Sequence, residues 1–413
     1  MTTQTFGASA PQRPHTVSQK SRSGPLMGLW AVTAAFLLNM AFSSVPTPLY
    51  VLYAERDGFD NLTVTYIYAV YAVGVIGSLF LGGHISDWVG RRTVLIPALL
   101  INVLSSLVFI LWPSLTGLIV ARIISGVSVG LTTATATAYL LELYRLARPD
   151  NSLQRPQMMA TMANIGGIGF GPLAAGLLAQ YAPQPLRLPY AVFGSALVVA
   201  AVFVWLSPET VTKTRRPYRP QRVAAPRGVR GTFFAGTAVG IGAFSVFGMF
   251  TSLVPVFLAD VLQETSRAVS GAMAFAAFAT GAGVQIFLAQ WQPRLMLQRS
   301  LPILALGLAC FTAGLWLPNL ILFLVGGMIT GAGAALAFRA AMVLVSVSAP
   351  PQSRAEVLAG YFLGGYVGLS LPVVGLGLAT LHWPARSAVV VFEAAAFLAM
   401  FIASGYLLRR RTT

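Results

Sequence analysis

The 413-residue chain is 56% hydrophobic and 9% charged, and its mean hydropathy is +0.75, whereas a soluble domain is about 25% charged. This composition excludes a water-soluble globular protein, because too little polar surface is available to cover one. The net charge of +16 could suggest a nucleic-acid ligand, but the basic residues lie in short loops between apolar runs, as in membrane proteins. No nucleic-acid partner is therefore expected.

In chain order, residues 1–27 are rich in Ser, Thr, Gln and Pro and predict a disordered tail. A cleaved signal peptide is the competing interpretation, but the first apolar run is too long for one. A membrane span needs about 20 apolar residues, and twelve such runs follow: 28–53, 64–85, 94–112, 116–142, 157–181, 188–206, 232–258, 267–290, 300–316, 319–346, 356–380 and 385–408.

The segment 207–231 is the only long connection between spans, and it separates them six and six. The sequence therefore predicts an all-α integral membrane protein with two six-helix bundles, residues 28–206 and 232–408, and a basic tail at 409–413. Glycine-rich stretches at matching places in spans four and ten, and in spans five and eleven, indicate two related halves. The same glycines could also serve ordinary helix packing.

The loops on one side of the predicted membrane hold 21 Lys and Arg residues, and those on the other side hold four. The positive-inside rule then places both termini and segment 207–231 in the cytoplasm. Arginine outnumbers lysine, which favours a GC-rich bacterial genome and hence the inner membrane. The basic residues of 207–231 are candidates for contacts with anionic lipid headgroups, although a solvated linker that sets the topology is the stronger interpretation.

Span one contains "NMAFSSVPTPLY", in which Asn39 begins a polar stripe and Pro46 and Pro48 break the helix. The carbonyls freed by the break could bind a ligand. The alternative is a proline kink that only shapes packing.

Spans two and three are joined by "GHISDWVGRRTVL". Gly83 and Asp87 are four residues apart and are expected on one helical face, where Gly83 would let another helix approach closely. Arg91 lies one turn further on and can pair with Asp87. The positive-inside rule alone would explain Arg91 and Arg92, but not an acid and a glycine at this spacing.

This stretch resembles the signature of the major facilitator superfamily at its glycines, Gly83 and Gly90, at Asp87, and at the basic pair Arg91 and Arg92; Trp88 departs from it. "RIISGVSVG" from Arg122 resembles the span-four motif of that family. "GIGFGPLAAG" resembles the span-five motif of its proton-linked antiporter branch, with Ala175 as a departure. The residues that carry this helix-packing motif are Gly167, Gly171, Pro172 and Gly176.

The resemblance implies a latch in which Asp87 meets the N-terminus of span eleven and closes the two halves at the cytoplasmic face. A helix N-terminus favours an anion by about 0.3–2 kcal/mol. Glu142 is a second partner that the family pattern implies. The resemblance also implies a fold of two rocking halves around a central cavity.

Three charged residues lie well inside the spans, where a charge is costly in free energy and each therefore requires a structural or functional explanation. Arg122 is a candidate for a substrate or proton contact, with a bond to a backbone carbonyl as the equal alternative. Arg339 either faces the cavity, where its planar fork suits an anionic group, or reaches the cytoplasmic surface. Glu393 is expected to make a local hydrogen bond or to be protonated, because span twelve is peripheral in the family. Gln285 suits a moderately polar cavity.

These features predict a secondary transporter that exports a small amphipathic compound or metabolite, driven by protons. Titrating groups would come from Asp87, Glu142 or Glu393, and Tyr66, Tyr68 and Tyr71 are expected in an interfacial belt. A uniporter or an importer of a sugar or organic acid is the first alternative, and a transport-inactive sensor or scaffold is the second.

The chain is expected to be a monomer. It is not expected to be an enzyme or to bind a metal or cofactor, because the sequence contains no nucleophile–base pair, metal-ligand spacing or phosphate-binding loop.

Overall fold

The computed structural model describes residues 23–214, 218, 220, 227–350 and 352–409. Twelve of its helical segments are long and apolar enough to cross a membrane, and no strand occurs in those ranges. The predicted all-α membrane fold is therefore confirmed. The predicted N-terminal tail before Ser23, the C-terminal tail after Arg409 and most of 215–226 lie outside the described residues.

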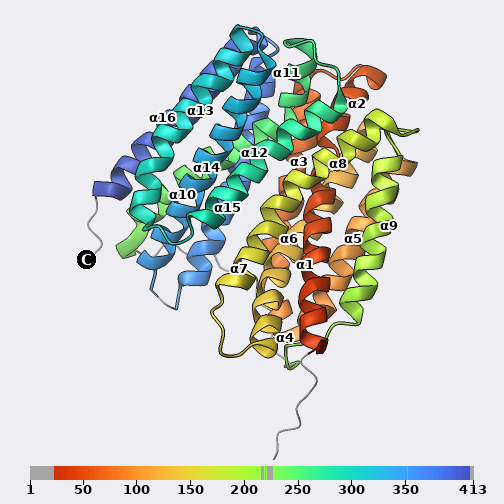
Figure 1. Ribbon diagram of the computed structural model, residues 1–413, viewed down its shortest axis with the longest axis vertical. Coiled ribbons are helices and arrows are strands. Elements are labelled where there is room, and N and C mark those ends of the chain that lie inside the picture. Colours follow the sequence, from red (N-terminus) through yellow and green to blue (C-terminus); the bar gives the residue numbers. More distant parts are fainter. Residues whose placement is uncertain (1–22, 215–217, 219, 221–226, 351, 410–413) are drawn as a thin grey trace, which may run out of the picture.

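The helices form two halves that lie side by side in Figure 1, the first coloured red to yellow-green and the second green to blue. The N-terminal half contains α1 (Ser23–Ser44), α2 (Tyr50–Asp57), α3 (Asn61–Gly82), α4 (Ser86–Val89), α5 (Arg91–Leu111), α6 (Leu115–Ala147), α7 (Gln154–Thr161), α8 (Gly167–Tyr181) and α9 (Leu188–Trp205). The C-terminal half contains α10 (Arg230–Ser252), α11 (Val254–Asp260), α12 (Arg267–Phe287), α13 (Pro293–Trp316), α14 (Leu320–Ser348), α15 (Arg354–Ala379) and α16 (Ala385–Arg409).

Three spans are interrupted. The first is broken at Pro46, as predicted, with a short 3₁₀ turn (Thr47–Leu49) between α1 and α2. The corresponding span of the second half breaks between α10 and α11, just before Pro255. Proline removes a backbone donor, so helices end or bend there. Span five instead contains a π-helical turn, Met162–Gly166, between α7 and α8.

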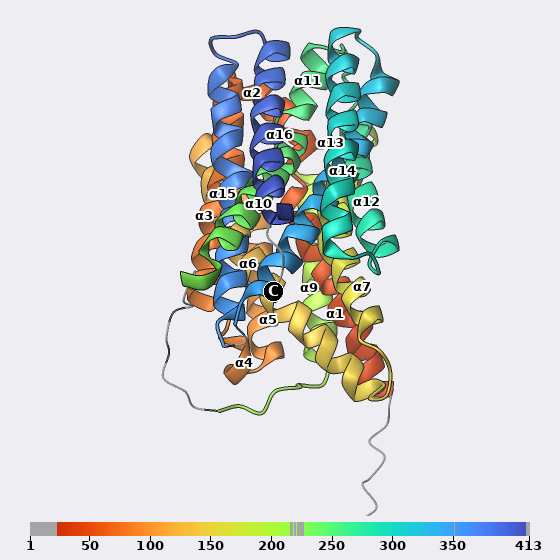
Figure 2. The same ribbon diagram turned by 90° about the vertical axis from the view of Figure 1, so that its left-hand side faces the viewer.

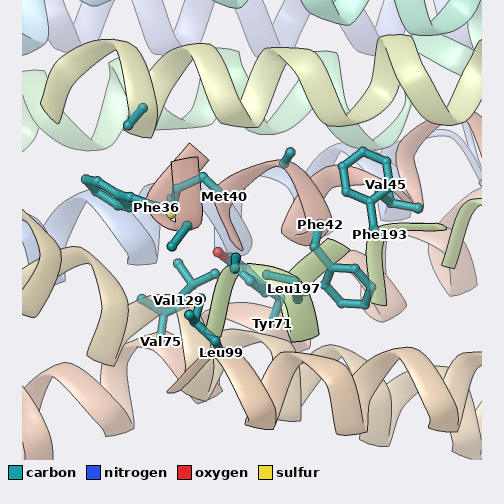
Figure 3. Close-up of a cluster of buried hydrophobic side chains, with 14 of the residues drawn as sticks. Phe36, Met40, Phe42, Val45, Tyr71, Val75, Leu99, Val129, Phe193 and Leu197 are labelled. Atoms are coloured by element: carbon teal, nitrogen blue, oxygen red, sulfur yellow. The ribbon is translucent and has the colours of Figure 1, made fainter. Parts of the chain in front are cut away.

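The interior of the N-terminal half is apolar and draws on five helices. Figure 3 shows Phe36, Met40 and Phe42 of α1, with Val45 just after it, among side chains from α3, α5, α6 and α9, and these belong to one buried cluster. Glycines allow close helix contacts around such clusters. A Cβ on Gly126 of α6 would lie 2.2 Å from the Tyr71 carbonyl oxygen of α3, and one on Gly326 of α14 would lie 2.3 Å from the Phe311 amide nitrogen of α13. The glycines shared by spans four and ten therefore serve helix packing in both halves.

The two ends of the molecule differ. One end carries α4 and the first turn of α15, and the other carries α2 and α11; Figure 2 shows α4 at the bottom and α2 and α11 at the top. We call these the α4 end and the far end. The halves meet toward the far end: a Cβ on Gly377 near the end of α15 would lie 2.2 Å from Thr65 Oγ1 in the first turns of α3, and one on Gly176 of α8 would lie 2.3 Å from the Arg267 carbonyl oxygen of α12.

Candidate functional site

Arg91 is the centre of a polar cluster at the α4 end. Its Nη1 donates to Asp87 Oδ1 (2.5 Å) and to Ser86 Oγ (2.8 Å), and its Nη2 donates to Glu142 Oε1 (2.8 Å). The Arg91 side chain is 8% exposed, whereas that of Asp87 is 59% exposed, so the bonds of Arg91 to Ser86 and Glu142 are better shielded from water than its bond to Asp87. Both pairings that we expected for Arg91, with Asp87 and with Glu142, are present.

Asp87 does not make the expected contact with span eleven in this conformation. Its side chain is 59% exposed, and among the described residues its recorded partner is Arg91. The expected close helix at Gly83 is absent too, because the nearest atoms to a Cβ there are backbone atoms of Leu79. The prediction of one shared helical face was wrong: α3 ends at Gly82, and Asp87 belongs to the separate short helix α4. The halves meet at the far end, so no helix of the second half covers Gly83.

Glu209 completes this cluster, and the sequence analysis missed it. Its carboxylate accepts hydrogen bonds from the backbone amides of Arg91 (2.8 Å) and Arg92 (3.1 Å), the first two residues of α5. Carboxylates stabilise helix N-termini in this way. Gly90 makes room for it, since φ is +117° there and a Cβ would lie 2.6 Å from Glu209 Oε2. Glu209 is the only acidic residue in 207–231, which is the one signal that could have identified it.

The start of segment 207–231 is therefore docked on the N-terminal half rather than solvated. Thr210 Oγ1 donates to Glu142 Oε2 (2.5 Å), and Tyr139 donates to the Pro208 carbonyl (2.6 Å). Arg92 Nη1 donates to the Trp205 carbonyl at the end of α9 (2.9 Å). A cation at a helix C-terminus is favourable, so Arg92 joins α5 to α9. These contacts link the Asp87 cluster to the segment that leads to the second half.

Arg122 of α6 is 2% exposed and bonds to carbonyls, which was one of its two expected roles. Its Nη1 donates to Ser43 O (2.6 Å), in the last turn of α1 where carbonyls lack helical partners. Its Nη2 donates to Tyr68 O (3.3 Å). The guanidinium carbon lies 4.4 Å from the Tyr71 ring centroid and 5.4 Å from that of Tyr68, within cation–π range.

Tyr68 and Tyr71 are thus buried partners of Arg122, and their assignment to an interfacial belt was wrong; Tyr66 is 52% exposed. Tyr68 also reaches the second half, because Thr251 Oγ1 of α10 donates to its hydroxyl oxygen (2.7 Å). Arg122 therefore holds a helix that takes part in the contact between halves.

Asn39 is fully buried in a polar network between helices of the first half. Its Oδ1 accepts from Asn102 Nδ2 and from Ser128 Oγ, both at 3.0 Å, and its Nδ2 donates to Thr132 Oγ1 (3.0 Å). Such bonds between membrane helices contribute about 0.6 kcal/mol each on average. In this conformation Asn39 connects α1, α5 and α6 and is not available to a ligand.

Gln285 and Arg339 lie together near the α4 end of the second half. Arg339 Nη1 donates to the Gln285 carbonyl (2.5 Å), and Gln285 Nε2 donates to the Ala335 carbonyl (3.1 Å). No salt bridge to Arg339 is found among the described residues. The guanidinium is partly exposed, so it retains donors for an anionic group.

Glu393 lies away from these residues, between α16 and α13. Its Oε2 accepts a hydrogen bond from Thr312, which is the local bond that we expected. Its Oε1 is buried and has no hydrogen-bond partner within the described part of the chain.

The span-five motif packs on helices from both halves. A Cβ on Gly171 would lie 2.0 Å from the Ala41 carbonyl oxygen of α1, and one on Gly167 would lie 2.6 Å from that of Leu37. On the other side, a Cβ on Gly271 of α12 would lie 2.2 Å from the Pro172 carbonyl oxygen. Gly176 approaches α12 as well, so α8 is wedged between α1 and α12 at the boundary between the halves.

Known proteins resemble this chain over part of their sequences. A putative multidrug resistance protein MdtD of Cronobacter sakazakii is 25% identical over 197 residues, which are 46% of this chain and 39% of the relative. The D-xylose-proton symporter-like 2 protein of Arabidopsis thaliana is 28% identical over 151 residues, 36% of this chain and 29% of the relative. The aligned regions thus span less than half the length of these relatives.

Solved structures match over nearly the whole length. A bacterial homologue of the human lysosomal transporter Spinster, inward-facing and unoccupied, has a TM-score of 0.70 at 16% identity and covers 96% of this chain and 99% of its own. A D-xylose-proton symporter has a TM-score of 0.69 at 15% identity and covers 92% and 97%. Residues 32–372 match the sequence profile of the Major Facilitator Superfamily. With twelve spans in two halves and this profile across most of its length, the chain belongs to the Major Facilitator Superfamily of membrane transporters.

Proposed function

We propose that this transporter exports a small amphipathic compound or metabolite in exchange for protons, across the inner membrane of a bacterium. Both termini would lie in the cytoplasm, on the side of the α4 end, where the loop arginines gather. The observation that carries the mechanism is the one-sided contact of the halves: α3 meets α15, and α8 meets α12, toward the far end. With the α4 end in the cytoplasm, this conformation is inward-facing.

Alternating access then requires the halves to close at the α4 end and separate at the far end. Asp87 is suited to that second conformation. Within the described part of the chain its side chain bonds to Arg91, and it is 59% exposed, so its carboxylate can also accept bonds from the first turn of α15 when that helix approaches. Arg91, Glu142 and Glu209 would hold Asp87 in place in both conformations.

Proton coupling needs a group that gains and loses a proton during the cycle. Asp87 and Glu142 share Arg91, so a proton on either one weakens the cluster and would favour opening of the α4 end. Movement of the halves would then be linked to protonation without an acid in the middle of the first or seventh span.

Export is favoured by the span-five motif. The glycines of α8 pack closely on α1 of the same half and on α12 of the other half, and such close packing would limit proton leak between the halves. The partial similarity to a putative multidrug resistance protein supports the same direction. Import of a sugar with protons is the second candidate, supported by the similarity to D-xylose-proton symporter sequences and structures.

Purified protein in proteoliposomes with an internal pH-sensitive dye tests the proposal. Under an imposed proton gradient, a transported compound from a panel of amphipathic amines, acids and sugars should release protons in the direction opposite to its own movement. An uncoupler should abolish its accumulation. Proton movement in the same direction as the compound would establish symport. Movement of the compound without accumulation, at a rate that the uncoupler does not change, would establish a uniporter. Either result rejects the proposal.

A further inference from the structure

A groove on the outside of the second half contains a buried acid that the transport cycle proposed above does not use. It lies between α13 and α16, which are neighbours at the upper left of Figure 1. Its volume is about 510 Å³, and most of its lining is apolar, including Ala309, Trp316, Val390 and Phe397. Ala309, Trp316 and Ala394 are exposed, so the groove opens on the surface that faces the bilayer.

Glu393 gives this groove a polar centre. The residue is 4% exposed, and its Oε2 accepts a hydrogen bond from Thr312, while its buried Oε1 lacks a partner among the described residues. A buried acceptor without a partner costs about 1–3 kcal/mol, and a carboxylate within hydrocarbon costs more. None of the ten lining residues is Lys, Arg or His. The groove therefore lacks a positively charged hydrogen-bond donor that would compensate an ionised Glu393.

We propose that this groove binds an amphipathic amine from the bilayer, with its ammonium group on Glu393 Oε1 and its apolar body along Trp316 and Phe397. The charges are complementary, and the aromatic rings suit both an apolar body and a nearby cation. A volume of about 510 Å³ fits a small ligand. The site lies on the outer surface of the second half and is separate from the boundary between the halves.

The depth of Glu393 favours a free amphiphile over a lipid headgroup. The residue is eight positions from the start of α16 at Ala385, which is about 12 Å along the helix axis. A phosphatidylethanolamine amine lies at the level of the helix ends and would have to descend that distance. A single-chain amine can sink without moving a phosphate into hydrocarbon.

Photo-crosslinking of the full-length protein in phosphatidylcholine nanodiscs tests this site. The probes are a long-chain alkylamine that carries a diazirine and the alcohol of identical chain, with labelled peptides identified by mass spectrometry. The amine should label α13 and α16 saturably. Glu393→Gln keeps the shape and the bond to Thr312, so it should weaken amine labelling by about tenfold or more, in line with loss of a charge-assisted hydrogen bond. Alcohol labelling should fall by clearly less, because the alcohol loses the strengthening of one hydrogen bond by the carboxylate but no attraction between opposite charges.

Two variants serve as controls. Glu55→Gln removes an exposed acid at the same end of the molecule and should leave labelling unchanged. Ala394→Leu fills the exposed part of the groove without touching the carboxyl group and should suppress labelling by both probes, so the site stays testable if Glu393→Gln unfolds. Equal amine labelling of wild type and Glu393→Gln would overturn the proposal. If phosphatidylethanolamine competes as strongly as the free amine, the occupant of the groove is a lipid headgroup and the proposal of a free amine is wrong.

Discussion

Asp87 keeps one oxygen against Arg91 while most of its side chain is open to solvent. Asp87→Asn preserves size and removes the charge, so insertion and folding should be nearly unaffected, since an exposed ion pair contributes about 0–1 kcal/mol. Transport should fall by about two- to thirtyfold, because a carboxylate at a helix N-terminus is worth about 0.3–2 kcal/mol. Initial rates in proteoliposomes measure this loss. Asp150→Asn, which removes an exposed acid in a loop at the same end, should transport normally, and normal transport by Asp87→Asn would reject the latch.

Arg339 lies 19 residues from the start of α14 at Leu320, about 28 Å along the helix, and binds a carbonyl rather than an acid. If it meets an anionic group of the substrate, Arg339→Gln should weaken binding of anionic compounds by about tenfold or more, since hydrogen bonds to charged groups are worth about 1.5–3 kcal/mol. Neutral compounds should bind equally well, and Arg339→Lys should restore binding only in part. Competition binding with matched anionic and neutral compounds measures these affinities. Equal losses of affinity for both classes would show that Arg339 is an interfacial anchor and does not contact the substrate.

The partners of Arg91 were predictable from a recognised motif, although helix spacing is not what joins it to Asp87, because Gly90 separates α4 from α5. Glu209 was not, since it acts on the amides of Arg91 and Arg92 from 118 and 117 positions away in the chain. The composition of segment 207–231, which is rich in arginine and proline, is typical of a solvated linker. Its single acid, Glu209, reaches a helix N-terminus only in the folded protein. Tyr68 and Tyr71 were misplaced for a similar reason: tyrosines near a span end suit the membrane interface equally well, and only the packing of α3 on α6 turns them toward Arg122.

At the scale of the helices, the packing of α8 on α1 depends directly on one small residue. A methyl group on Gly171 would lie 2.0 Å from the Ala41 carbonyl oxygen, which belongs to backbone and cannot move aside easily. Gly171→Ala should therefore separate α8 from α1, lower the unfolding free energy by about 1–3 kcal/mol and increase proton leak. Gly77→Ala is the matched control, because no heavy atom lies within 4 Å of its Cβ. Dye-monitored proton leak and thermal unfolding distinguish the two; a tight, stable Gly171→Ala protein would show that the motif is dispensable.

Four of the helices that begin at the far end share a capping pattern. Asp60 Oδ1 accepts from the Thr63 amide (2.7 Å), and Ser114, Ser266 and Asn319 cap α6, α12 and α14 in the same way. Hydrogen bonds from Thr63 lower the pKa of Asp60. Asp60→Ala should cost about 0.5–2 kcal/mol of stability at neutral pH.

The pH dependence of this effect has a definite sign. A lowered folded-state pKa means that the charged cap stabilises the protein above the ordinary aspartate pKa of about 3.9 and loses this effect as the pH falls through the folded value. The stability difference between wild type and Asp60→Ala should therefore shrink below about pH 4. Thermal unfolding at pH 7 and in the acidic range measures this difference. A difference that does not change with pH would show that the charge of Asp60 does not contribute to the cap.

The twelve spans were predictable because a hydrocarbon environment demands long apolar helices, and proline marked the break in the first span. The break between α3 and α4 and the π-helical turn before α8 were not. Both lie beside glycine pairs, Gly82-Gly83 and Gly166-Gly167, and glycine stabilises a helix less than most other residues do. Which glycine ends a helix and which only packs depends on neighbours that the local sequence does not reveal.

At the scale of the molecule, the two halves form one transporter through contacts that run from the far end into the middle of the α8–α12 pair, where a Cβ on Gly169 would lie 2.9 Å from Phe278 Cβ. Thr65 and Gly377 approach each other at the far end, and Tyr68 and Thr251 share a hydrogen bond nearby. An alternating-access cycle must break these contacts once per turnover. Two hydrogen bonds between the halves, from Thr251 to Tyr68 and from the Arg267 amide to Gln180, must break when the halves part. Tyr366 and Val373 of α15 pack in the buried cluster of the first half, so this opening also exposes apolar surface.

A reversible cross-link tests whether this closure must open. A Cβ on Gly377 would lie 3.1 Å from Thr65 Cβ, close to the separation of about 3.5–4.5 Å that disulfides need. In a Cys310→Ser background, which removes the single natural cysteine, Thr65→Cys with Gly377→Cys should cross-link under mild oxidation and stop transport. Reduction should restore it, and each single-cysteine protein should be insensitive to oxidant, which controls for damage elsewhere. Substrate binding measured from the α4 end should survive the cross-link, because the bond holds the conformation that is open there. Full transport by the oxidised double variant would mean that the halves never part at the far end, and alternating access by rocking would have to be abandoned for this protein.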